Sequence, residues 1–228
     1  KKDFGARHGG AFNRPRPTPE QIVAPPDGSP TVHASPKHAV DFIIESVKRY
    51  PHEVTLVVIG PVTNIAMAIR KAPEIVPMIR RILYMGGAFD VPGNTTPAAE
   101  LNWWFDPEAV RIVVRSPIEQ VVNALDLSDT VFFDKEKYDR VVAVETPVTR
   151  LYKAAFGPRF EKNPAARSLV WDTITAAYLL DPSIVTEWRE AWVDMDVTFG
   201  PNYGRSMAYN ADPPPFLQKM KIMKNIDR

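Results

Sequence analysis

Short apolar runs alternate with segments of helical period through the first half of the chain, and this alternation constrains the fold most. Three runs of four to six residues, most of them apolar, lie at 54–59, 82–85 and 121–125. Apolar side chains recur at helical spacing within 39–49, 62–69 and 106–114. Apolar runs without polar alternation are typical of strands buried on both faces of a parallel sheet. The pattern predicts an α/β fold: a mostly parallel, open, Rossmann-like sheet flanked by helices.

The whole chain is interpreted as a single domain in three parts. Residues 1–37 are rich in Pro, Gly and charge, which predicts an extended loop. Residues 38–130 form the predicted α/β core. Residues 131–228 form the predicted helical cap and last strands, with helices expected near 134–144, 146–156 and 172–180 and strands near 192–199 and 217–223.

Composition excludes several classes of function. The net charge is +1, from 28 basic and 27 acidic side chains, so a general basic surface for nucleic acid is not expected. Cysteine is absent, which excludes disulfides and leaves oxygen or imidazole ligands for any metal. No apolar run approaches the ~20 residues that span a bilayer, so no membrane partner is expected.

Polar residues follow the predicted strands. The segments GPVTN (60–64), MGGAF (85–89) and LD (125–126) each stand where a strand ends, and residues 93–102 form the most polar loop. Because ligands of open parallel sheets bind beyond the carboxyl ends of the strands, these segments predict the binding site.

Four motifs in this region resemble a known family. GPVTNIA (60–66), MGG (85–87), GN with AELN (93–94 and 99–102) and DPEA (106–109) follow one another in the order and spacing of the inosine-uridine nucleoside hydrolase family. The resemblance continues through WD (171–172) and DPS (181–183), and covers residues 39–200 best. It implies a nucleoside hydrolase-like fold, a small-molecule nucleoside as substrate and a homo-oligomer.

The resemblance implies that the N-glycosidic bond of a ribonucleoside is cut by water, with a bound Ca²⁺ that holds the water and two ribose hydroxyls. Calcium requires hard oxygen ligands. Thr63 matches a ligand through its backbone carbonyl, and Asp172 matches a carboxylate ligand. Taken without the resemblance, Thr63 and Asp172 are equally helix-capping residues.

The same resemblance implies a set of ribose contacts. Acceptors around the sugar stabilise the positive charge that develops in glycoside hydrolysis. Asn94 and Glu100 match residues that hold the 5′-hydroxyl, Asn102 matches a contact to another hydroxyl, and Met85 matches an apolar contact under the ring. Without the resemblance, Glu100 and Asn102 are ordinary residues of a solvated loop.

One departure from the family concerns its Asp-rich calcium motif, Asp-x-Asp-x-Gly-x-Asp-Asp, which residues 1–60 do not contain. The general base, most calcium ligands and the first strand or strands are therefore expected upstream of residue 1. We expect the 228 residues alone to be inactive, since one carboxylate and one carbonyl fall short of the ~6–8 oxygens that Ca²⁺ takes.

A second departure concerns the base. Trp171 stands where some family members carry a histidine that protonates the leaving base. In purine-preferring members of the family an aromatic residue at this place stacks on the base, so the resemblance implies a preference for purine nucleosides. Two alternatives remain open: a non-catalytic ribose-binding or nucleoside-binding fragment or subunit, and a hydrolase of a different riboside.

His8 matches a family His-Gly only weakly, and Trp103 and Trp104 are expected to include one side chain that points away from the core.

Overall fold

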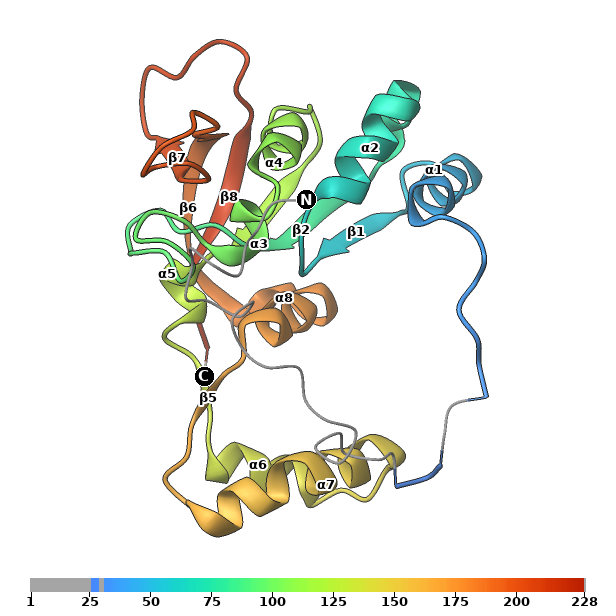
Figure 1. Ribbon diagram of the computed structural model, residues 1–228, viewed down its shortest axis with the longest axis vertical. Coiled ribbons are helices and arrows are strands. Elements are labelled where there is room, and N and C mark those ends of the chain that lie inside the picture. The colour runs from blue at the N-terminus through green and yellow to red at the C-terminus, as the bar shows by residue number, and fades with distance from the viewer. Residues whose placement is uncertain (1–25, 29–30, 228) are drawn as a thin grey trace.

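The computed structural model describes residues 26–28 and 31–227 and shows one six-stranded sheet as its centre (Figure 1). The strand order is β1-β2-β3-β8-β6-β7. The first four neighbours run parallel: β1 (Thr55–Val58), β2 (Arg81–Met85), β3 (Gln120–Asn123) and β8 (Lys219–Ile226). The antiparallel partners are β6 (Val185–Met195) and β7 (Ser206–Tyr209). The predicted α/β class with a mostly parallel sheet is confirmed.

Helices cover both faces of this sheet. One face carries α1 (Ala39–Arg49), α2 (Thr63–Lys71), the 3-10 helix η3 (Pro73–Met78) and α4 (Pro107–Val114), packed on a core that includes Tyr84 and Val122. The other face carries α5 (Leu125–Ser128) and α8 (Trp171–Leu180), packed on Leu83 and Val121. Successive strand residues therefore serve opposite layers, which explains why these strands are apolar throughout.

The chain bounds these helices with local signals. Asp106 is the N-cap of α4 and accepts from the Ala109 N–H, and Pro107 takes the first helical position. Thr63 is not an N-cap: Val62 holds that place, and Thr63 is the first residue of α2. The short helix α3 (Leu101–Trp104) was not foreseen from the sequence; Glu100 caps it.

A second group of elements lies apart from the sheet, at the bottom of Figure 1. It consists of α6 (Lys135–Val142), α7 (Pro147–Lys162) and the two-stranded pair β4 (Phe132–Phe133) and β5 (Ser168–Leu169). Its core is a small aromatic cluster around Tyr138 and Phe160. We call these residues, 132–169, the α6–α7 unit.

Three expectations need correction. The strand expected at 192–199 begins at Val185 and ends at Met195, followed by a loop, and the strand expected at 217–223 runs from Lys219 to Ile226. The 3-10 helix η4 (Pro182–Ile184) leads directly into β6. Trp103 and Trp104 are both buried, since Trp103 packs on the Gly86–Gly87 turn and Trp104 on Gly204.

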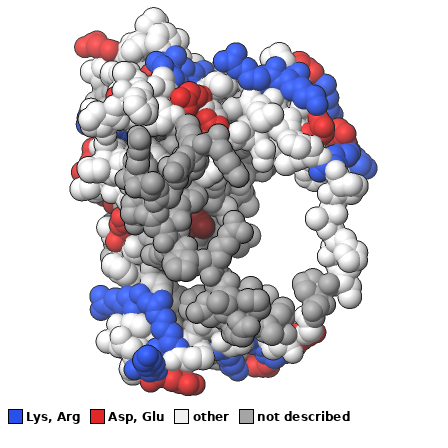
Figure 2. Space-filling model, in the orientation of Figure 1, with Lys and Arg blue, Asp and Glu red and all other residues white. Residues whose placement is uncertain are grey.

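Residues 26–28 and 31–37 contain no helix or strand; His8 lies outside the described residues. No helix within the described ranges is long and apolar enough to cross a membrane. Charged side chains of both signs gather over α1 and α2 and over the α6–α7 unit, in line with the small net charge (Figure 2).

Candidate functional site

The carboxyl ends of β1, β2 and β3 meet at one edge of the sheet because the three strands are parallel. Thr63 follows β1 at the start of α2, Met85 ends β2, and Asn123 ends β3 directly opposite Met85 in the register. This edge is where an open parallel sheet binds its ligands. It therefore brings the polar segments predicted from the sequence to one place.

A tight turn follows β2 at this edge, and Trp103 explains why it contains two glycines. A Cβ atom on Gly86 would stand 2.2 Å from the indole nitrogen of Trp103, and Gly87 adopts a φ of +77°. Both conditions exclude side chains. The turn directs the Gly87 N–H toward Glu100.

Glu100 is the most buried acidic residue of the site, with 1% of its surface exposed. Its Oε1 accepts from the Asn102 N–H at 2.8 Å, and its Oε2 accepts from the N–H groups of Gly87 at 2.9 Å and Trp103 at 3.1 Å. Burial raises the pKa of Glu100 to about 7, which the three N–H donors oppose and the nearby charge of Asp172 reinforces. Glu100 is thus a buried cap of α3, rather than a residue of a solvated loop.

Asn102 and Asn94 are tied to the same turn. The side-chain amide of Asn102 donates to the Met85 carbonyl at 3.1 Å and lies 3.3 Å from the Met85 sulfur. The Asn94 side-chain oxygen accepts from the Leu101 N–H at 2.9 Å. Four of the residues predicted to surround a ribose, Met85, Asn94, Glu100 and Asn102, are therefore brought together through short hydrogen bonds in the α3 region.

Asp172 reaches this cluster from the other half of the chain. It is the second residue of α8, whose N-cap Val170 provides no side-chain hydrogen bond, so Asp172 does not cap the helix. Burial raises the pKa of Asp172, and its charge acts on Glu100. No ion pair to Asp172 occurs within the described part of the chain. Two carboxyl groups thus share one edge without a basic partner in the described part of the chain, and the charge of Asp172 disfavours ionisation of Glu100.

Trp171 precedes Asp172 and is held in place. Its indole N–H donates to Asp129 at 2.6 Å, and 38% of its surface stays exposed. The side chain of Thr63 does not belong to this cluster. Its hydroxyl donates to Asp106 at 2.6 Å and so joins α2 to α4.

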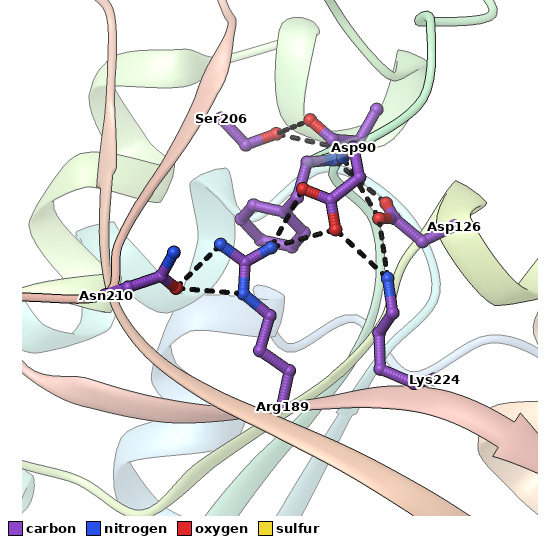
Figure 3. A network of polar contacts seen from close by, with 8 residues as sticks. Asp90, Asp126, Arg189, Ser206, Asn210 and Lys224 are labelled. Carbon is purple, nitrogen blue, oxygen red and sulfur yellow. Dashed lines mark hydrogen bonds and ion pairs between the residues drawn. The ribbon is translucent and has the colours of Figure 1, made fainter.

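A polar network holds the turn that follows β2 (Figure 3). Of its labelled residues, only Asp126 lies in a segment that the sequence predicts to be part of the binding site. Asp126, 1% exposed at its side chain, accepts from the N–H groups of Phe89 and Asp90 at 2.9 and 3.0 Å. Lys224 lies between Asp90 and Asp126, at 3.0 and 3.4 Å, and Arg189 binds Asp90 and Asn210. The network ties the turn to β8 and β6. A polar residue directly after a strand is the one signal that could have revealed it.

A cleft of about 810 Å³ opens beside the start of α8. Val170 and Thr173, which flank Trp171 and Asp172, line one side, and the α6–α7 unit supplies the aromatic side chains Phe133, Tyr152 and Phe156. Within the described ranges, no group of three or more His, Asp or Glu residues is arranged to hold a metal.

The fold and site together define a class: an open α/β sheet that carries acidic and amide side chains at the carboxyl edge of its parallel strands. Comparison with known proteins identifies the family. The family model described as inosine-uridine preferring nucleoside hydrolase matches residues 6–228, and the chain belongs to this family.

Individual relatives differ in the substrate that their names state. A pyrimidine-specific ribonucleoside hydrolase of Escherichia coli, RihB, is 36% identical over 190 residues, which are 82% of this chain and 60% of the relative. A purine-preferring ribonucleoside hydrolase from Gardnerella vaginalis has a TM-score of 0.68 at 30% identity, over 86% of this chain and 63% of that one. A plant nucleoside hydrolase, PpNRh1, has a TM-score of 0.75 at 26% identity, over 87% and 66%. The chain thus spans about 60% of the length of the curated relatives it matches.

Proposed function

We propose that the protein hydrolyses the N-glycosidic bond of ribonucleosides to ribose and free base. The observation that carries the proposal is the cluster of Met85, Asn102 and Glu100, with Asp172 close enough for its charge to act on Glu100, at the edge where such a sheet binds ligands. This cluster brings together polar side chains from two segments some 70 residues apart. Packing of the sheet alone does not require polar side chains there.

In this proposal the sugar lies over Met85. Asn102 and Asn94 present amide groups that bind hydroxyls, and Glu100 keeps lone pairs beyond those used by the three N–H groups. Water attacks C1′ as the bond to the base breaks, and positive charge develops on the ring. The partial negative charges that face the sugar then stabilise the transition state more than the substrate.

We propose Ca²⁺ as the metal, with the Asp172 carboxylate and the Thr63 carbonyl as ligands. The chemistry of Asp172 fits, because its partly buried carboxyl group has no basic partner in the described ranges and raises the pKa of its acidic neighbour Glu100. These two oxygens are a part of the ~6–8 that the ion takes. When bound, Ca²⁺ supplies a charge that holds hydroxyl groups and lowers the pKa of water. No residue in the described ranges is assigned as general base.

We further propose a preference for purine nucleosides. Trp171, which is partly exposed and fixed by Asp129, stands beside the aromatic cleft. A fixed aromatic plane next to a cleft of this size suits a bicyclic base. The stated specificities of the relatives point in both directions, so the substrate assay must decide. A homo-oligomer is likewise a proposal, which sedimentation of the native protein tests.

The test is ribose release from inosine, adenosine, guanosine and uridine by full-length protein from its native source, with and without a calcium chelator. We expect purine turnover that chelation abolishes. The variant Asp172→Asn should lose at least ~100-fold in kcat/KM. Asp181→Asn is the matched control, since Asp181 stands at the opposite end of α8 and its side chain accepts only from Ser183 among the described residues. Folded protein that binds nucleosides without releasing ribose would overturn the proposal.

A further inference from the structure

Asn123 occupies an unexpected place for a polar side chain. It ends β3, it is fully buried, and it pairs in register with Met85 of β2. Partnered residues of parallel strands point to the same face. Because Leu83 and Val121, two residues earlier on each strand, pack against α8, Met85 and Asn123 also face that helix.

The side-chain amide of Asn123 binds the first turn of α8. Its Nδ2 donates to the Trp171 carbonyl at 2.8 Å and to the Thr175 hydroxyl at 3.3 Å. The Thr175 hydroxyl in turn donates to the Tyr84 carbonyl of β2 at 3.4 Å. The N-cap residue Val170 makes no side-chain hydrogen bond to this helix. Asn123 of β3 therefore provides the side-chain tether that an N-cap would otherwise supply.

The other half of the amide is unused. The Oδ1 of Asn123 is buried and has no hydrogen-bond partner among the described residues. A buried acceptor without a donor costs free energy, which a valine, as at the two preceding positions 121 and 122, would not. The burial of an amide at this position is thus explained by the bonds that its N–H groups make, and not by packing.

We infer that Asn123 is a positioning residue for Asp172: by holding the Trp171 carbonyl, it fixes the peptide group shared by Trp171 and Asp172 and sets the Asp172 carboxyl group near Glu100. The role of Asp172 in catalysis rests on the proposed function, whereas the tether itself does not. Small displacements of a ligating or substrate-binding group reduce the rate strongly. A residue that fixes the position of Asp172 should therefore affect the rate of the reaction.

A matched pair of variants tests this inference in the full-length protein. Asn123→Leu keeps the branched shape of the side chain and removes the donor. Gln120→Leu is the control: Gln120 is also a buried amide of β3, but it binds Tyr84 and the carbonyls of Val114 and Ser116. Asn123→Ser, which keeps a short donor, serves as the conservative variant.

The first readout is amide hydrogen exchange of residues 172–176, with the ¹⁹F resonance of fluorotryptophan at Trp171, assigned by Trp171→Phe, as the second. We expect Asn123→Leu to speed exchange at least ~10-fold and to move the resonance, with Gln120→Leu unchanged in both and Asn123→Ser intermediate. Neither readout needs turnover, so these shifts support the tether even if the wild type hydrolyses no nucleoside.

The third readout is kinetic. If the wild type is active, Asn123→Leu should lose at least ~10-fold in kcat/KM while its unfolding midpoint stays near that of the wild type. Unchanged exchange and an unchanged Trp171 resonance in Asn123→Leu would overturn the inference. So would a faster exchange together with full activity, because Asp172 would then not depend on the tether.

Discussion

The carboxyl edge of the sheet and the α6–α7 unit are built by different means. At the edge, buried groups distant in sequence bind one another: Glu100 binds Gly87, Asn123 binds Trp171, and Asp126 binds the turn at 89–90. Each of these side chains is 1% exposed or less. A buried hydrogen bond in a low dielectric fixes its partners closely, because breaking it leaves an unsatisfied group.

The α6–α7 unit depends on local and exposed contacts. Its core is the cluster of Tyr138, Phe160 and Ala166, and its ion pairs are solvated, as between Lys135 and Asp139. Solvated pairs contribute little to stability. The comparison teaches that buried bonds fix the geometry of the edge, whereas we expect the unit that lines the cleft to open without disturbing the sheet.

The most severe test of the rigid edge is Gly86→Ala. The added Cβ would meet the fully buried Trp103 indole at 2.2 and 2.3 Å, and neither backbone nor ring can yield there. We expect a loss of about 4 kcal/mol or more in the free energy of unfolding, measured by urea denaturation. Gly60→Ala is the control, since nothing lies within 4 Å of its added Cβ, and it should change stability by less than about 0.5 kcal/mol. Equal effects of the two variants would show that the edge is not tightly packed.

The pH dependence of stability tests whether Glu100 is buried at the carboxyl edge of the sheet. Its pKa is about 7 in the folded protein against the ordinary value of 4.5, so the folded state holds the proton more tightly than the unfolded state. This contribution is complete below about pH 4.5 and is lost as the pH rises through 7; the full difference corresponds to roughly 3 kcal/mol. Denaturation of wild type and Glu100→Gln between pH 5 and 8 measures it. The stability advantage of the wild type should shrink over this range, and a constant difference would contradict the burial argument.

The sequence predicted the edge better than it predicted the contacts there. Strand ends, the Asp106 cap and the polar segments follow from periodicity and local chemistry. Asn123 and the partners of Asp126 do not, because their bonds join residues 36 to 98 positions apart. The burial of Glu100 also escaped prediction, since a Glu between a polar loop and an apolar segment usually faces solvent.

The boundaries of the last strands were the weakest predictions, and β6 shows why. Its exposed Thr186, Glu187 and Trp188 break the apolar alternation, yet backbone pairing with β8 continues through them across a register shift. Local propensity could not reveal a strand whose pairing partners lie 27 to 41 residues further along the chain.

Phe160→Ala tests the independence of the α6–α7 unit. Phe160 is 1% exposed and contacts Phe133 and Tyr138, so its loss should destabilise the unit by about 2 kcal/mol, less than a sheet-core truncation because the small cluster can collapse. Hydrogen exchange should quicken across 135–162 and stay unchanged in β2 and β3. Faster exchange in both regions would break the comparison, since the two would then unfold together.

The smallest effect is expected from Arg150→Ala. The Arg150 guanidinium binds both oxygens of Asp27 at 3.0 and 2.9 Å and also lies near Glu145, and all three side chains are solvated. The short distances raise the pKa of Arg150 through Asp27, but water and salt screen the pair. The urea midpoint should stay unchanged at physiological salt and shift only slightly at low salt. A large shift would mean that the segment at Asp27 clamps the α6–α7 unit, and that the unit is held from outside by the leading part of the chain and not by its own small core.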